Sequence, residues 1–139
     1  MESNINNEVD QYQRYLQDLI DYPLNQYNGI YRNISWSIKR IYGHWDGYIH
    51  GLSDNQIDII EPYVHGGITA KQYRTIGFNC AHSSSLKDNS LNREKGDYYH
   101  GWLRQQGYNS ILYQPNNTYK NYNWIVNHLY SLIDLISTN

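Results

Sequence analysis

The chain has 139 residues, with 11 lysines and arginines against 13 aspartates and glutamates, for a formal net charge of −2 at pH 7. A chain of this length is expected to form one domain, residues 1–139, around one core, and not two independent domains. The small negative charge argues against long nucleic acids as partners, and a single cysteine excludes an internal disulfide.

A first amphipathic helix is predicted over residues 7–22. Its apolar side chains recur every three or four residues, which is the spacing of one helix face: Val9, Tyr12, Leu16, Leu19 and Ile20. Pro23 ends the helix, because the residue before a proline is pushed out of the helical conformation.

A strand-rich part is predicted over residues 34–82. Apolar and polar side chains alternate from Ile34 to Ile38, which is typical of a half-buried strand. The predicted strands are 34–38, 48–50, 57–64 and 75–81, with a turn at 43–47 between the first two.

Residues 83–97 are polar and predict an exposed, mobile loop beside the strands. A second helix is predicted over residues 121–137, with Asn121 as its N-terminal cap and an apolar face made of Tyr122, Ile125, Val126, Leu129, Leu132, Ile133 and Ile136. Two helices bracketing short strands predict an α+β domain, a small antiparallel sheet with the N- and C-terminal helices packed on one face.

No apolar run approaches the roughly 18 residues that a membrane span needs. The first residues are polar, and one unpaired cysteine suits a reducing compartment. We therefore expect a cytoplasmic protein with no membrane partner.

Two short motifs, residues 65–69 (HGGIT) and 77–82 (GFNCAH), hold the only cysteine, two of the six histidines and three glycines. Glycines let a ligand approach the backbone, and imidazole and thiol groups move protons, bind metals or attack electrophiles. If the chain has a chemical site, we expect it here.

One interpretation of these motifs is a nucleotide pocket. His65 then contacts a phosphate or acts as a general base, Thr69 supplies a hydroxyl, and Trp45 or Tyr48 stacks on a base. The pattern Tyr-x-His-Gly recurs at 48–51, 63–66 and 98–101, which suggests that these elements meet in space. The predicted ligand-binding residues are His65, Gly66, Gly67, Thr69, Cys80, His82, Trp45, Tyr48 and His100.

Two further interpretations use the cysteine. His65, Cys80 and His82 together offer three ligands for zinc, since Cys80 and His82 are two residues apart and share one face of a strand. Alternatively Cys80 is a nucleophile activated by His65 or His82. No cofactor is the simpler expectation, because the chain has no CxxC, HxxxH or HExxH spacing.

The two motifs, together with Gly47-Tyr48-Ile49 and Trp124-Ile125-Val126, resemble a family of small uncharacterised proteins encoded mainly by bacteriophages and prophages. Its members usually have GYV, HGGLTY and GFDCAH, and the resemblance covers about residues 43–137. The chain departs from that pattern at Asn79, Ala70 and Ser83-Ser84. The loss of an acid at position 79 disfavours an enzyme that needs a carboxylate beside Cys80 and His82.

The resemblance implies a phage-type anti-defence protein of the infected bacterial host's cytoplasm. We expect it to bind and sequester a small nucleotide immune signal, a cyclic nucleotide or an ADP-ribose derivative. A hydrolase or phosphodiesterase that degrades such a nucleotide, with His65 and His82 as acid and base, is the alternative. A second alternative is an inhibitor that binds a host protein through exposed tyrosine and tryptophan. Homo-oligomers are compatible with each of these.

Overall fold

The computed structural model describes residues 2–82, 96–99 and 117–137. Along the chain the elements are α1 (Glu2–Asp21), β1 (Gln26–Tyr31), β2 (Ile34–Ile41), β3 (His44–Ile49), α2 (Asp54–Ile60), the 3-10 helix η1 (Glu61–Tyr63), β4 (Ala70–Gln72), β5 (Thr75–Asn79) and α4 (Tyr122–Ser137).

The strands form one five-stranded antiparallel sheet in the order β1-β2-β3-β5-β4. Three of its neighbouring strand pairs are joined by two-residue turns in which both residues have positive φ: Arg32-Asn33, Tyr42-Gly43 and Tyr73-Arg74. Such turns match the right-handed twist of a hairpin.

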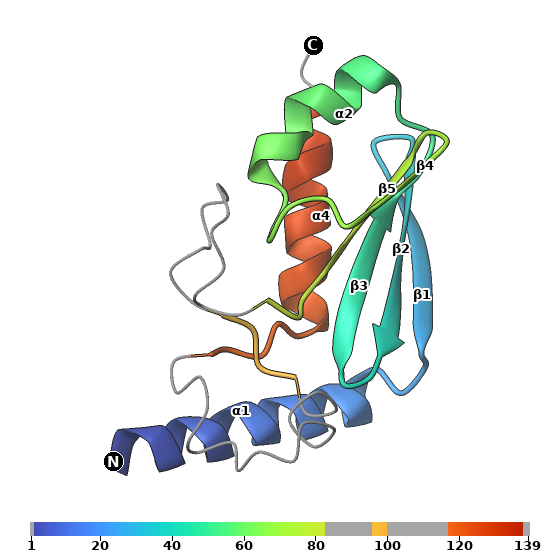
Figure 1. The fold of residues 1–139 in the computed structure, drawn as a ribbon. Helices are drawn as coiled ribbons and strands as arrows, with labels where there is room; N and C mark the ends of the chain where they lie inside the picture. The colour runs from blue at the N-terminus through green and yellow to red at the C-terminus, as the bar shows by residue number, and fades with distance from the viewer. Residues whose placement is uncertain (1, 83–95, 100–116, 138–139) are drawn as a thin grey trace.

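One face of the sheet is covered by α4, and α2 packs on α4 in turn (Figure 1). The core between them is made of buried apolar side chains from the strands and helices, including Trp36, Ile38, Trp45, Ile49, Leu52, Ile57, Ile60, Ile76, Phe78, Cys80, Ile125, Leu129 and Ile133. The closest approach is at Gly47, where an added Cβ would lie 2.7 Å from Phe78 and 3.3 Å from Ile125. A side chain at position 47 would therefore separate β3 from α4.

The helix α1 crosses the end of the sheet (Figure 1). The buried carboxylate of Asp18 helps to fix it there. Asp18 accepts hydrogen bonds from Trp45 Nε1 at 2.8 Å, from the Tyr119 hydroxyl at 2.6 Å and from the Tyr122 N–H at 3.2 Å. Burial, together with the charge of Asp18, raises the pKa of Tyr119, so its hydroxyl remains a donor. Asp18 thereby ties α1 to the sheet and to the start of α4.

The predicted α+β architecture is confirmed: one domain with an antiparallel sheet flanked by the N- and C-terminal helices. The C-terminal helix was placed within one residue, and Asn121 caps it by accepting from the Trp124 N–H at 2.9 Å. None of the described helices has the length and apolar character needed to cross a membrane.

The predicted apolar face of α1 was wrong in detail. Val9, Leu16 and Ile20 are exposed, whereas Gln11 and Asp18 are buried. The polar side chains are turned inward because they bond to the segment before α4: the Tyr119 N–H donates to Gln11 Oε1 at 2.7 Å. Helical spacing identified the helix but not the face that the fold buries.

Several boundaries in the strand-rich part also differ. Residues 44–47, predicted as a turn, lie in β3, since the chain already reverses at Tyr42-Gly43. Residues 57–64, predicted as a strand, form the end of α2 and η1, because Ser53 and Gln56 make a reciprocal capping box that starts a helix. The strands β1 and β4 were not predicted.

The predicted mobile loop 83–97 lies outside the described residues except for Gly96 and Asp97. Both are buried, and Asp97 is only 2% exposed. The predicted exposure is therefore wrong for Gly96 and Asp97, because polar composition does not reveal that a carboxylate has buried partners.

Replacing Asp18 with alanine should lower the free energy of unfolding by about 2–4 kcal/mol, because it leaves the Trp45 and Tyr119 donors buried without their acceptor. Asp21→Ala is the matched control, since Asp21 lies on the same helix and its exposed carboxylate accepts from the exposed side chain of Gln17. We expect the control to lose less than about 0.5 kcal/mol. Urea unfolding of both variants measures the difference, and equal losses would contradict this role of Asp18.

Candidate functional site

His65 lies on a tight turn that follows η1. The Gly67 N–H donates to the Val64 carbonyl at 2.9 Å, and Gly66 and Gly67 both have positive φ, +67° and +85°. The backbone N–H of His65 donates to Nε2 of His128 at 3.0 Å. The turn is thereby attached to the middle of α4.

His82 follows the end of β5, and its ring lies directly over Gly66. A Cβ added to Gly66 would be 1.9 Å from His82 Nε2, so the ring occupies the space that any other residue would need. The ring centroids of His65 and His82 are 5.4 Å apart. Glycine is thus required at position 66 both by its φ and by the neighbouring imidazole.

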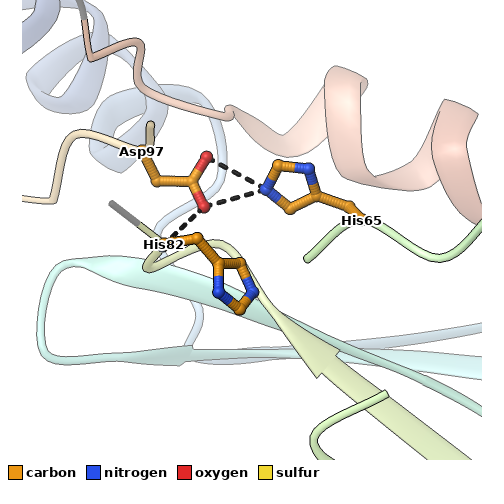
Figure 2. A group of neighbouring side chains, drawn as sticks. All are labelled: His65, His82 and Asp97. Atoms are coloured by element: carbon orange, nitrogen blue, oxygen red, sulfur yellow. Dashed lines mark hydrogen bonds and ion pairs between the residues drawn. The ribbon is translucent and has the colours of Figure 1, made fainter. Parts of the chain in front are cut away.

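Asp97 joins these two histidines (Figure 2). Its carboxylate oxygens lie 2.9 and 3.1 Å from His65 Nε2, and one of them accepts from the His82 N–H at 2.9 Å. Lys120 adds an ion pair, with Nζ 2.9 Å from Oδ1. In return, the Asp97 N–H donates to the His82 carbonyl at 2.6 Å.

Aromatic rings enclose the cluster on the side of α4. Trp124 meets the edge of the His65 ring with centroids 4.9 Å apart, and it stacks on His128 at 5.1 Å. Lys120 Nζ lies 5.6 Å from the centre of the Trp124 ring. The His65 side chain is consequently only 3% exposed.

The electrostatics favour a charged Asp97 and a neutral His128. Burial alone would raise the pKa of Asp97, but the hydrogen bond and charge of His65, the charge of Lys120 and the His82 N–H outweigh it and lower that pKa. Burial, and then the charge of His65, lowers the pKa of His128 to about 4. Because His128 Nε2 accepts from His65, the proton of its neutral ring is on Nδ1.

His65, His82 and Asp97 also have the chemistry of metal ligands. One ligand atom from each lies within 4.8 Å of the others. The ligands of a tetrahedral zinc ion lie about 3.4 Å apart, so His82 must move toward the other two to complete the set. The Nδ1 atom of His65 makes no hydrogen bond with the described residues and can take the ring proton when Nε2 binds a metal.

Cys80 is not part of this group of potential ligands. It is 1% exposed within the apolar core, and its N–H donates to the Trp45 carbonyl. Burial, reinforced by the charge of Asp97, raises its pKa well above the usual range, so the thiol is protonated. The strand β5 ends at Asn79, so Cys80 and His82 do not share a strand face as predicted.

The other predicted residues are dispersed. Trp45 is fully buried, with its N–H on Asp18, and is unavailable to stack on a ligand. Tyr48 lies on the opposite face of the sheet, and the Thr69 hydroxyl donates to the Gly77 carbonyl at 3.4 Å. His100 lies outside the described residues.

Sequence reasoning missed Asp97, Lys120, Trp124 and His128. A usable signal existed only for the last two, because Trp124 and His128 are four residues apart and share a face of the predicted helix. Asp97 is 32 residues from His65, and no local pattern reveals such a pair.

Comparison of the chain with known protein families, with curated proteins and with solved structures found no match. Any functional inference therefore depends on the side chains of the site. The resemblance of its motifs to phage and prophage proteins stays a prediction.

Substituting alanine for Gly66 should destabilise the chain more than the same change at Gly67. Both positions have positive φ, so both variants bear the cost of about 1–2 kcal/mol for a side chain in this conformation. The new Cβ collides with His82 at Gly66, whereas none of the described residues lies within 4 Å of a Cβ at Gly67. Thermal unfolding and the imidazole NMR signals of His82 check this, and equal effects of the two variants would contradict the packing of His82 on Gly66.

The low pKa of His128 predicts an acid-sensitive fold. Its folded pKa of about 4 lies below its ordinary value of 6.5, so the unfolded chain takes up this proton first as the pH falls. The stability that neutral His128 contributes is therefore present above pH 6.5 and is lost as the pH falls toward 4. Urea unfolding across this range should show a steeper loss in the parent than in His128→Gln, which keeps an acceptor for the His65 N–H. Parallel curves would refute the assignment.

Proposed function

We propose that the chain is a metal-assisted hydrolase of small phosphoesters, with His65, His82 and Asp97 holding the ion. The observation that carries this proposal is the position of Asp97 between the two histidines. Two imidazoles and one carboxylate form a ligand set of catalytic zinc, with coordination positions left for water and substrate. Such an ion lowers the pKa of its bound water and polarises a phosphoryl oxygen.

Asp97 also removes the objection raised by Asn79. The sequence lacks an acid at position 79, but the Asn79 side chain accepts from the Ala81 N–H at 3.2 Å, and an aspartate would accept the same bond. The carboxylate beside His82 comes instead from Asp97. An enzyme therefore does not depend on an acid at position 79.

The residues around the ligands have separate roles in this proposal. Lys120 holds one carboxylate oxygen of Asp97 and so orients the carboxylate. Its amine also donates to the Thr118 carbonyl and hydroxyl, so the ammonium is itself held in place beside Asp97. Neutral His128 fixes the His65 turn without adding a positive charge close to the ion.

The nucleotide class of substrate comes from the interpretation of the two motifs as a nucleotide pocket, and the phage context comes from their resemblance to phage and prophage proteins. A role against host immune signalling would follow from hydrolysis of such a messenger. The second candidate function is sequestration without cleavage. It is supported by the contacts of Asp97, because Lys120 and His65 already pair with its carboxylate and no metal ion is needed to neutralise it.

Metal binding is tested by removing metals with EDTA and adding Co²⁺ or Zn²⁺ to the full chain. We expect one ion per chain, with affinity that falls at low pH because imidazole binds a metal only in its neutral form. His82→Ala removes one ligand ring but keeps the N–H bond to Asp97, and it should weaken binding at least about tenfold. Cys80→Ala is the control and should bind as the parent does.

Cleavage is tested on the same samples with a panel of cyclic dinucleotides and ADP-ribose derivatives, followed by chromatography. Fragments that require metal and disappear in His82→Ala support the hydrolase. A nucleotide that binds and returns intact after heat denaturation supports sequestration instead. Loss of metal in Cys80→Ala, or no stoichiometric metal in the parent, would overturn the proposed centre.

A further inference from the structure

A second polar site lies on the face of the sheet opposite α4. It is an open hollow of about 410 Å³ lined by residues from β2 to β5. Sites for small organic ligands have volumes of about 300–1,000 Å³. The hollow is therefore large enough for more than a lone inorganic ion.

The strand register explains why a hollow forms here. Ser37, Tyr48 and Gly77 are directly opposite one another on β2, β3 and β5. Because Gly77 has no side chain, the Tyr48 ring lies against its backbone, and an added Cβ would be 2.8 Å from the ring. The floor of the hollow is thus an aromatic ring seated on β5.

His50 is held at the end of the hollow by two hydroxyl groups. Its Nε2 lies 2.9 Å from Ser37 Oγ, and its Nδ1 lies 3.3 Å from Thr75 Oγ1. Burial, and then the charge of Lys39, lowers the pKa of His50, so the ring is neutral at pH 7. The three side chains form a fixed polar wall.

Among the described residues that line the hollow, Lys39 is a cation and none bears a carboxylate. The Lys39 Nζ lies 5.4 Å from the centre of the Tyr48 ring. Asp46 lies opposite Lys39 in the register, but its carboxylate is 3.0 Å from His44 Nδ1. The Gln72 amide and the exposed ring of Tyr73 complete the lining.

We propose that this hollow binds a small organic phosphate of the nucleoside monophosphate class. Lys39 and the neighbouring hydroxyl groups suit the phosphate, and the Tyr48 and Tyr73 rings suit the base. The site is separate from His65, His82 and Asp97 and needs no metal. Binding in the hollow is independent of whether His65, His82 and Asp97 hold a metal ion.

The test is calorimetric titration of the EDTA-treated full chain with 5′-AMP, adenosine and inorganic phosphate. We expect AMP to bind more tightly than either fragment, because it engages both the cation and the rings. Lys39→Met keeps the aliphatic stem and loses the charge, and it should weaken AMP binding about tenfold. Lys71→Met, on β4 outside the lining, should not change it.

NMR amide shifts locate the ligand, and those of Ser37 and Gly77 should move on titration. Binding in His82→Ala should equal that of the parent, which separates this site from the metal centre. The proposal is overturned if AMP gives neither heat nor shifts, if adenosine binds as well as AMP, or if Lys39→Met binds like the parent. Equal binding of inorganic phosphate would overturn the nucleoside part.

Discussion

The carboxylate of Asp97 is the constraint on which the candidate site depends. It joins the His65 turn, the chain after β5 and the segment before α4 through one pair of oxygens. The backbone continues this connection, since the Tyr98 N–H donates to the Thr118 carbonyl at 2.9 Å and the Thr118 N–H donates to Gly96 at 3.0 Å. Burying a carboxylate costs several kcal/mol unless donors surround it, so these segments must meet for Asp97 to be buried. The fold therefore sets the positions of the His65 turn and of the His82 backbone, and the His82 ring is the part that moves to complete a ligand set.

Asp18 is a second buried carboxylate, and it holds a different part of the fold from Asp97. Asp18 holds α1 against the sheet and the start of α4, whereas Asp97 holds the two histidines. Lys120, only two residues before α4, pairs with Asp97, so the same short segment is anchored from both sides. Without such anchors this polar segment would have little apolar surface to bury. The requirement for polar partners accounts for a helix α1 that turns Gln11 and Asp18 inward and leaves Val9 and Ile20 exposed.

Sequence reasoning predicted elements that local patterns encode, but few of the contacts between residues that are far apart in the sequence. Alternation along β2 and the apolar face of α4 were sufficient for the α+β architecture, because burial of those faces depends on neighbours in sequence. The helix α2 was predicted as a strand, because a short apolar run fits either structure. The capping box of Ser53 and Gln56 is the feature that distinguishes the helix from a strand. The two motifs contribute His65 and His82 to the candidate site, but their partner Asp97 is non-local. Trp45 was assigned to ligand binding because a sequence does not show that Asp18 satisfies its N–H in the core.

The side chains of residues 77–82 lie in three different environments. The pleat of β5 sends Phe78 into the core and leaves Gly77 on the opposite face, beneath Tyr48, and Cys80, directly after the strand, is also buried in the core. Beyond the strand, His82 turns toward Gly66 and Asp97. A cysteine between a glycine and a histidine therefore does not indicate a shared site, since the strand separates their side chains. The strand β5 thus forms a wall of the core, lines the hollow on the opposite face through Thr75 and Gly77, and leads into the chain that carries His82.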